Sequence, residues 1–290
     1  MIQKSEEALS LLLSGEFEKA KAIYSVLLDR DPLDPESTSG YYIASFWDHR
    51  LDLILGTREG KERGKLILSL FSDFELEMNK RKYLETPTFR AAQECILSEA
   101  KDHLKLAYQW EGANALDRDL LRELTACLLK LQDYKMALEI LTYAGEKQTP
   151  VLDFYLAETY CMLGREREGI ELYRLSFLND PQNLSFSYLR FRPILDLIAK
   201  AKTLSDREED WKEIIPVLAW REGLFRLPGK KDGATIDRWV SELTRLLDSK
   251  KRNGENFRLS ARIEQFALAI INCADDIRSR DAITLAKELI

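Results

Sequence analysis

The sequence predicts an all-α protein built from stacked helical hairpins. Apolar residues recur at intervals of three and four through most of the chain, and no stretch alternates with period two for long enough to form a strand. Glycine and proline separate these helical patterns. One pattern of small residues, glycine, tyrosine and proline occurs twice, 149 residues apart. We expect about fourteen helices, and stacked hairpins are the simplest way to bury their apolar faces.

The composition is typical of a folded protein and argues against several function classes. Of 290 residues, 45% are hydrophobic and 32% are charged. The net charge of −6 disfavours a general nucleic-acid binder, which needs a basic surface. No run approaches the roughly 18 apolar residues of a membrane span, and the first residues lack the pattern of a cleavable signal. We expect a cytoplasmic protein. Its four widely spaced cysteines are interpreted as buried free thiols: Cys95, Cys127, Cys161 and Cys273.

Residues 1–34 predict the first hairpin. Gly15 separates two helical patterns and suits a tight turn, because glycine tolerates positive φ. Pro32 ends the second helix, because proline has no backbone N–H to donate. The apolar faces that meet are Ala8, Leu9, Leu11, Leu12 and Leu13 before the turn, and Phe17, Ala20, Ile23, Tyr24, Leu27 and Leu28 after it.

The same hairpin recurs at 150–183, with a weaker copy at 117–149. With a constant shift of 149 positions, Ala8, Gly15, Ala20, Tyr24 and Pro32 correspond to Ala157, Gly164, Gly169, Tyr173 and Pro181. The small residues would let two helix backbones approach closely, and the tyrosine would fill the space above them. The weaker copy keeps Ala137 and Leu141 but has no closing proline; instead, Thr149 and the proline after it are expected to cap and begin the next helix.

These spacings resemble the tetratricopeptide repeat (TPR), a helix–turn–helix of about 34 residues with L-G-x2-Y, A-x3-F and a closing proline. "LAETY" at 156–160 stands for the first element, with alanine in place of glycine. "AKAIY" at 20–24 and "GIELY" at 169–173 stand for the second, with tyrosine in place of phenylalanine. The three hairpins cover about one third of the chain. The resemblance implies a TPR-like α-solenoid over 1–183, with divergent helices at 35–116.

Other helix boundaries follow from caps and prolines. A helix is expected over 34–55 with Asp34 as its cap, another from Thr57, and a third capped by Thr86. The region 184–290 is expected to be helical, divergent and continuous with the array. In that region Pro193 and Pro216 should kink or restart helices, Ser205 and Glu208 have the spacing of a capping box, and further helices are expected near 234–250 and 256–277 and at the terminus.

No residue pattern nominates an enzyme, and we expect no cofactor or metal. The only histidines, His49 and His103, have no second histidine or cysteine at metal-ligand spacing. The glycine- and lysine-containing segments at 56–65 and 227–235 do not fit the phosphate-binding pattern GxxxxGK[ST]. The acidic run "DREED" at 206–210 is more simply a charged first turn of a helix, which the helix dipole favours.

The TPR resemblance implies a scaffold or adaptor that holds a peptide or protein on the concave surface formed by the first helix of each hairpin. The predicted partner-binding residues are Leu9, Leu12 and Leu13; Arg122, Ala126 and Leu129; and Phe154, Glu158 and Cys161. Some family members clamp a terminal carboxylate with lysine and asparagine, but the equivalent places here hold Ser5, Leu9, Phe154 and Glu158, so a more apolar ligand is expected. Phe154→Ala together with Arg122→Ala is expected to weaken partner binding with little loss of stability. Alternatively, neighbouring helices cover these residues.

Three further features leave alternatives open. The aromatic run "YYIASFW" at 41–47 is either sandwiched between hairpins or lines a partner groove on one side. Residues 226–262 hold ten Lys or Arg against five Asp or Glu, which indicates a solvated face or an acidic partner. The terminal stripe either folds back or docks on a second copy or another protein; it consists of Ala282, Ile283, Leu285, Ala286, Leu289 and Ile290. The runner-up function is a structural or regulatory subunit of a larger assembly that docks through its ends.

Overall fold

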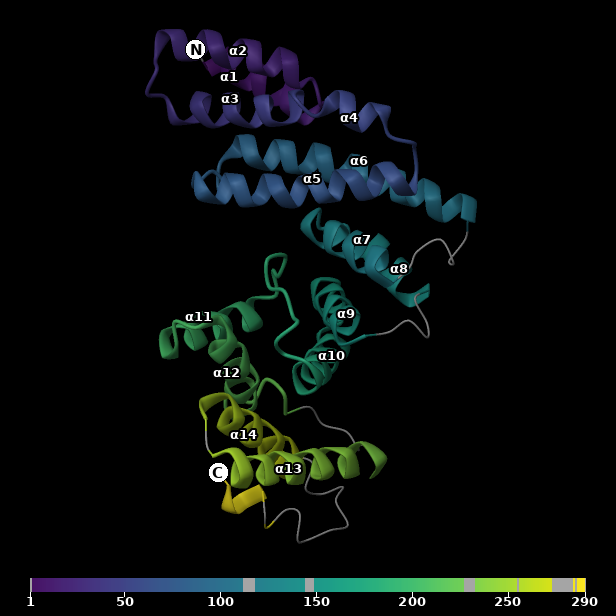
Figure 1. The fold of residues 1–290 in the computed structure, drawn as a ribbon, viewed down its shortest axis with the longest axis vertical. Helices are drawn as coiled ribbons and strands as arrows, with labels where there is room; N and C mark the ends of the chain where they lie inside the picture. The colour runs from purple at the N-terminus through teal and green to yellow at the C-terminus, as the bar shows by residue number, and fades with distance from the viewer. Residues whose placement is uncertain are drawn as a thin grey trace. The chain divides into compact units, whose positions relative to one another are not determined.

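The computed structural model describes residues 2–111, 118–143, 149–226, 233–254 and 256–272, together with 284 and 286–289. These residues form fourteen α-helices longer than one turn and contain no strand, which confirms the all-α prediction for the part of the chain described. The chain divides into two compact units, Met1–Asp133 and Tyr134–Ile290 (Figure 1). No helix in the described ranges is long and apolar enough to cross a membrane.

The first unit consists of hairpins that follow one another along the chain. Its helices are α1 (Ile2–Leu13), α2 (Phe17–Arg30), α3 (Pro35–Asp48), α4 (Leu51–Gly56), α5 (Lys61–Lys80), α6 (Pro87–Glu111) and α7 (Arg118–Lys130). Helix α2 packs between α1 and α3, α5 pairs with α6, and α6 also contacts α1, α3 and α7. The core of this unit is aromatic: Trp47 and Phe74 are fully buried, with ring centroids 5.2 Å apart, and Phe74 stacks on Phe89.

The second unit begins at α8, and its helices contact both sequential and more distant helices of the unit. Its helices are α8 (Tyr134–Tyr143), α9 (Pro150–Met162), α10 (Glu166–Asn179), α11 (Arg192–Leu204), α12 (Glu208–Arg221), α13 (Gly233–Asn253) and α14 (Phe257–Asn272). Helix α9 pairs with α8 and α10, α12 contacts α10, α11 and α14, and α13 packs on α14. The predicted hairpin 117–149 therefore contributes α7 to the first unit and α8 to the second, and residues 144–148 lie outside the described ranges.

The 149-residue shift found in the sequence is present in the backbone. Helices α2 and α10 have the same length, and their first and last residues differ by that shift. The turn before each is closed by one hydrogen bond of the same kind, from Glu16 N to Leu11 O at 2.9 Å and from Arg165 N to Tyr160 O at 2.8 Å. The two turn glycines adopt φ of 78° and 79°, as their tolerance of positive φ predicts. Hairpins 1–34 and 150–183 thus share one turn geometry.

The turn after α7 has this geometry without a glycine. Asp133 N donates to Leu128 O at 2.9 Å, and Gln132 adopts φ of 57°. Gln132 therefore occupies the left-handed position that Gly15 and Gly164 hold in the other two turns. A residue with a Cβ is strained there, because its side chain crowds the following carbonyl.

Small residues set the close approach of α9 and α10. A Cβ added at Gly169 would lie 2.7 Å from Ala157 O and would also clash with Cys161 Sγ. The ring of Tyr24, in the first hairpin, likewise fills the space that a side chain at Gly40 would need, so α2 and α3 pack closely. The predicted role of the small residues in backbone approach is confirmed for Gly169.

Three predicted caps are confirmed, and two boundaries differ. Asp34, Thr86 and Thr149 accept hydrogen bonds from the backbone N–H three residues on, at 2.9, 3.2 and 3.3 Å. The helix predicted over 34–55 is wrong: it breaks after Asp48, where Arg50 N donates to Trp47 O at 2.9 Å. Thr57 does not begin α5, which starts at Lys61 after a glycine at positive φ.

The proline and capping-box predictions in the second unit had mixed outcomes. Pro193 lies in the first turn of α11, where a missing N–H has no intrahelical partner to lose. Pro216 lies inside α12 without ending it. Ser205 does not cap α12 as predicted; Arg207 precedes the helix, and Ser205 Oγ instead accepts from Arg207 N at 3.2 Å.

Candidate functional site

The nine predicted partner-binding residues differ widely in exposure. They come from α1 and α7 in the first unit and from α9 in the second. Leu13 and Arg122 are exposed, Leu9 and Ala126 are partly buried, and Leu12, Leu129, Phe154, Glu158 and Cys161 are buried. A partner therefore cannot contact the three predicted residues of α9 directly, because other residues cover them.

The face of α9 is covered by the chain that follows α10. The rings of Phe186 and Tyr188 pack against Phe154 and Tyr155 with centroids 5.6 and 4.8 Å apart, both edge-to-face. Tyr188 is itself buried. This face of α9 is therefore covered by a neighbouring part of the chain and is not an open groove for a partner. The burial of Phe154 conflicts with the expectation that Phe154→Ala together with Arg122→Ala costs little stability, because removing a fully buried phenylalanine ring costs about 3–5 kcal/mol.

Glu158 is a buried carboxylate that holds this covering segment. Its Oε1 accepts from the backbone N–H of Arg190 at 2.6 Å and of Phe191 at 3.2 Å, and its Oε2 accepts from the hydroxyl of Tyr173. Burial raises the pKa of Glu158, although these three donors act in the opposite direction. The carboxylate is fully engaged in holding the segment after α10 against α9 and α10.

Cys127 and Cys161 are buried and Cys95 is partly buried, whereas Cys273 lies outside the described ranges. Burial raises the pKa of Cys95 to about 11 and that of Cys127 to about 12, and it raises the pKa of Cys161 as well. A thiol with such a pKa stays protonated at neutral pH and reacts slowly. Cys127 Sγ donates to Leu97 O at 3.3 Å, so it packs as a weakly polar core side chain.

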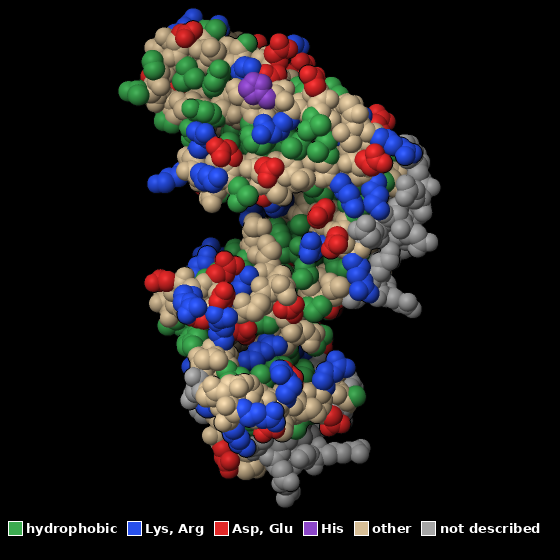
Figure 2. All heavy atoms as spheres, in the orientation of Figure 1, with side chains coloured by type: hydrophobic (Ala, Val, Ile, Leu, Met, Phe, Trp, Pro, Cys, Tyr) green, Lys and Arg blue, Asp and Glu red, His purple; other side chains and the backbone are tan. Residues whose placement is uncertain are grey.

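The histidines have no shared site. His103 is buried and accepts from Gly60 N at 3.3 Å through Nδ1, while its Nε2 lies 3.1 Å from Glu99. His49 is exposed at the end of α3 and is the purple side chain in Figure 2. Within the described ranges, no group of three or more His, Cys, Asp or Glu is arranged to hold a metal ion.

The hollowed surface of the first unit follows helix α5. One hollow of about 470 Å³ lies between α3 and α5 and is lined by Phe46, Arg50, Asp73, Leu76, Glu77 and Lys80. A second, of about 350 Å³, is lined by Lys65, Leu68, Ser69, Phe71, Ser72, Asp73, Leu97, Glu123, Ala126, Cys127 and Lys130, from α5, α6 and α7. Asp73 belongs to both. We call the two hollows and the α5 residues between them the α5 surface.

Aromatic side chains create the first hollow. The Phe46 ring on α3 and the Phe74 ring on α5 pack 5.1 Å apart, and rings between two helices keep their backbones apart. The run 41–47 is thereby divided: Ile43, Ala44 and Trp47 are buried, whereas Phe46 lines the hollow and Tyr42 is 43% exposed beside it. One side of this helix is packed in the core, as the first alternative for this run predicted, and its other side faces a hollow.

Two arginines stack on aromatic rings of α3, one on Phe46 in the lining of the hollow and one on the exposed Tyr42. The guanidinium of Arg50 lies 3.6 Å from the Phe46 ring centroid, and that of Arg81 lies 4.3 Å from the Tyr42 ring centroid. Arg81 is also hydrogen-bonded to Glu77 at 2.9 Å, which neutralises that carboxylate. Stacking fixes the orientation of each guanidinium and leaves some of its N–H groups facing outward.

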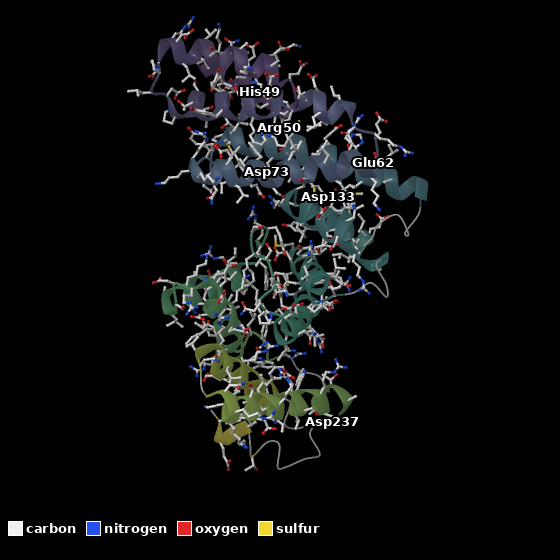
Figure 3. All side chains as sticks on the ribbon, viewed as in Figure 1. His49, Arg50, Glu62, Asp73, Asp133 and Asp237 are labelled. Atoms are coloured by element: carbon white, nitrogen blue, oxygen red, sulfur yellow. The ribbon has the colours of Figure 1, made fainter. Side chains whose placement is uncertain are left out.

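Unpaired charges lie on both sides of the hollow. Arg50 and Asp73, labelled in Figure 3 on neighbouring helices, have no ion-pair partner among the residues that the structure describes. The apolar side chain beside them is Leu76, which is 61% exposed. The first hollow therefore offers an apolar contact flanked by a fixed cation and a free carboxylate.

The second hollow has an apolar floor and a charged rim. Its floor includes Phe71, Leu97 and the predicted residue Ala126. On its rim, Lys130 Nζ contacts both carboxylate oxygens of Glu75 at 2.5 and 2.6 Å and lies 5.1 Å from the Phe71 ring centroid. Ala126 is thus the one member of the predicted set that lines either hollow among the described residues.

Sequence reasoning missed the α5 residues of this surface. Leu76 lies off the buried side of α5, which includes Ile67, Phe71, Phe74 and Met78. A large apolar residue on the polar face of an amphipathic helix was the available signal. The predicted C-terminal stripe falls mostly outside the described ranges; of its members, Ala286 is buried and Leu289 is partly buried. Residues 227–232 of the segment 227–235 also lie outside them.

Comparisons with protein-family models, with curated proteins and with solved structures found no match to this chain.

Proposed function

We propose that this protein is a TPR-like interaction scaffold that holds a peptide or protein segment on the α5 surface. The observation that carries the proposal is the pair of hollows on either side of α5. The first combines the exposed Leu76 with the stacked Arg50 and the carboxylate of Asp73, and the second has an apolar floor with a charged rim. The duplicated hairpin supports the TPR-like assignment, since its turn geometry occurs in both copies.

The chemistry of the surface suits a protein segment. Leu76 and the Phe46 ring offer apolar area that a partner's side chain would remove from water. Arg50 is held by stacking, so it loses little conformational freedom on binding a partner. Aromatic residues and arginine are the side chains that most often dominate interface energies.

The N-terminal end of the first unit does not favour docking through that end. The exposed residues of α1 are mostly polar and include Lys4, Glu6, Glu7 and Ser10. A mostly polar face offers little apolar area for a docked partner to cover. We therefore prefer the scaffold function over a subunit that docks through this end.

Two leucines of equal exposure test the proposal. Leu76 on α5 is 61% exposed, and Leu204 at the end of α11 in the second unit is 63% exposed. A photo-crosslinking residue at each position is compared in cell extract, and a protein captured only through position 76 is purified. Its affinity is then measured for Leu76→Asp and Leu204→Asp.

We expect Leu76→Asp to weaken binding by about tenfold or more, because it places a charge against the apolar contact. Leu204→Asp should leave the affinity unchanged. Equal crosslinking at both positions, or equal affinity of both variants, would contradict the proposal. Matching melting temperatures for the two variants exclude misfolding as the cause.

A further inference from the structure

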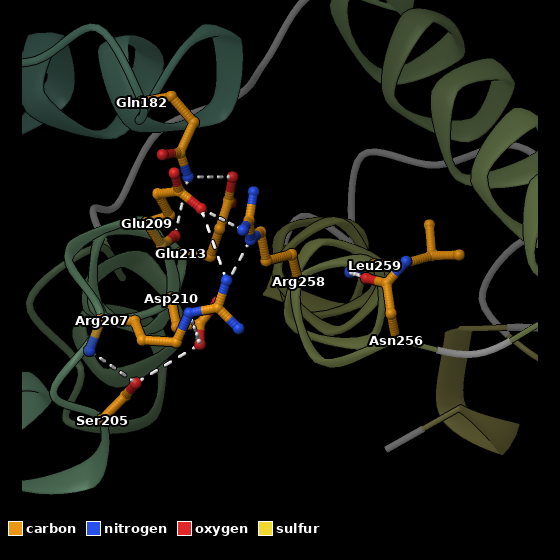
Figure 4. A network of polar contacts seen from close by, with 9 residues as sticks. All are labelled: Gln182, Ser205, Arg207, Glu209, Asp210, Glu213, Asn256, Arg258 and Leu259. Atoms are coloured by element: carbon orange, nitrogen blue, oxygen red, sulfur yellow. Dashed lines mark hydrogen bonds and ion pairs between the residues drawn. The ribbon is translucent and has the colours of Figure 1, made fainter.

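A second charged surface lies on α13, in the basic region 226–262. Part of that region is used inside the second unit. Arg258 donates to Asp210 Oδ1 at 3.1 Å and pairs with Glu209, which joins α14 to the first turn of α12 (Figure 4). Arg262 donates to Phe177 O at 2.9 Å and so caps the end of α10. Among the described residues of this region, the exposed basic side chains are therefore mainly those of α13.

Three arginines form a line along the outer side of α13. Arg238, Arg245 and Arg252 are all exposed and follow one another at seven-residue intervals. Seven residues are nearly two helical turns, so the three side chains lie on one side, spaced about 10 Å apart along the axis. The apolar residues of α13 are buried on the other side and include Ile236, Trp239, Leu243 and Leu246. We call this row the arginine line.

The charges of the line are available to a partner. Arg245 donates to Glu242 through Nε at 2.8 Å and Nη2 at 2.6 Å, which orients its guanidinium and leaves further N–H groups free. Arg238 and Arg252 have no ion-pair partner within the described ranges. In Figure 2, blue side chains gather on the part of the second unit that contains α12 to α14.

We propose that the arginine line binds an acidic α-helix whose carboxylates recur every seven residues. Carboxylates at that interval on a partner helix have the same spacing as the three guanidiniums, so each arginine can meet one carboxylate along parallel axes. The interaction is independent of the α5 surface, because the line belongs to a different unit.

The acidic residues beside the line favour a helix over a nucleic acid. Asp237, Glu242 and Asp248 lie on α13 at either side of the line, so carboxylates flank its arginines until Lys250 and Lys251 add positive charge in the last turn. A nucleic-acid backbone carries a phosphate about every 3.4 Å per strand. Most of those phosphates would fall between the arginines and near the carboxylates of α13. A partner helix with one carboxylate in seven residues places its negative charges at the arginines and away from the carboxylates of α13.

Labelled peptides test this spacing with the full chain. The probe is an alanine- and glutamine-based helix with three glutamates at seven-residue intervals. The matched control peptide has the same composition with the glutamates at five-residue intervals, which spreads them around the helix. A short DNA duplex serves as the competing polyanion, and anisotropy is measured at low and high salt.

The variant Arg238→Gln with Arg252→Gln is compared with Arg192→Gln, a charge on α11 whose side chain is 82% exposed. We expect the seven-spaced peptide to bind about fivefold more tightly than the control peptide at low salt, and binding to weaken as salt screens the charges. The double variant should weaken the binding of the seven-spaced peptide by about tenfold. Arg192→Gln should change the affinity for that peptide by less than about twofold.

Equal affinity for the two peptides, tighter binding of the DNA duplex, or no measurable binding of the seven-spaced peptide at low salt would each overturn the proposal. The thermal melting signal of each variant, followed by circular dichroism, reports whether α13 keeps the packing of its buried side, which includes Trp239. If the double variant keeps that signal and still binds as tightly as the unmodified chain, the arginine line is not the site.

Discussion

The guanidinium of Arg50 lies 3.6 Å from the centre of the Phe46 ring, and its Nη1 donates to the carbonyl oxygen of the same residue at 2.7 Å. One arginine therefore both covers an aromatic ring and satisfies a backbone carbonyl near the end of α3. The break between α3 and α4, which the sequence did not predict, brings this arginine to the edge of the hollow between α3 and α5.

Replacing Arg50 with alanine should lower the free energy of unfolding by about 1–2 kcal/mol, from loss of the cation–π contact and of the hydrogen bond to Phe46 O. Arg50→Lys keeps the charge but not the planar stack, so most of the loss should remain. Urea denaturation measures both. Arg58→Ala, at an exposed position just after α4, is the control and should change stability by less than about 0.5 kcal/mol.

A methyl group at Gly169 should destabilise the second hairpin. Its Cβ would lie 2.7 Å from Ala157 O and against Cys161 Sγ, so α9 and α10 must move apart, at a cost of about 1–3 kcal/mol. Cys161→Ala in the same chain should recover part of this loss, because one of the two clashing atoms is removed. Thermal melts of the single and double variants check the coupling. Additive losses would mean that the sulfur does not limit the approach.

Gln132→Gly should stabilise the protein. Gln132 holds φ of 57° in a turn where the equivalent residues are Gly15 and Gly164. Relief of left-handed strain is worth about 1–2 kcal/mol, partly offset by the greater freedom of glycine in the unfolded chain, so a net gain of about 0.5–1 kcal/mol is expected. Gly15→Ala is the reverse experiment and should lower the melting temperature. A lower melting temperature for Gln132→Gly would show that its side chain contributes more than the backbone strain costs.

Glu158 should make stability depend on pH in a defined direction. Burial raises its pKa in the folded state above the ordinary 4.5, so the folded chain binds this proton more tightly than the unfolded chain. Ionisation of Glu158 therefore lowers stability as pH rises from about 4.5 through the raised folded value, and the penalty stays at neutral pH. Glu158→Gln can keep the acceptor for Arg190 N and Phe191 N while removing the charge.

The difference in melting temperature between Glu158→Gln and the unmodified chain should therefore favour the variant at neutral pH and shrink toward pH 4.5. The comparison cancels the other buried acids, such as Glu213, whose pKa burial also raises. Glu158→Ala is the control: it leaves two backbone N–H groups and a tyrosine hydroxyl without an acceptor, which costs about 3 kcal/mol or more. A difference that does not vary with pH would show that Glu158 has an ordinary pKa.

The candidate site was only partly predictable. Phe46 belongs to an aromatic run that stood out in the sequence, and Ala126 was among the predicted partner-binding residues. Asp73 and Leu76 were not identified, because α5 carries no repeat pattern and its neighbours on both sides are set by packing. Phe154 and Glu158 had the right spacing for a groove, but the chain after α10 lies over them.

The local features of the fold could be predicted from the amino-acid sequence. Asp34, Thr86 and Thr149 cap helices, and Gly15 and Gly164 close turns, because each acts on backbone groups within a few residues of itself. The repeat of one hairpin after 149 positions was visible for the same reason.

Which side of each helix is covered depends on the tertiary packing and could not be predicted from local patterns. Residues 186–191 bury the predicted face of α9, and the pair Phe46–Phe74 keeps α3 and α5 far enough apart to leave a hollow. Both outcomes depend on side chains more than 25 positions apart in the chain. An amphipathic pattern marks the side of a helix that can be buried, but the area left exposed depends on the size and position of the neighbour that packs against it.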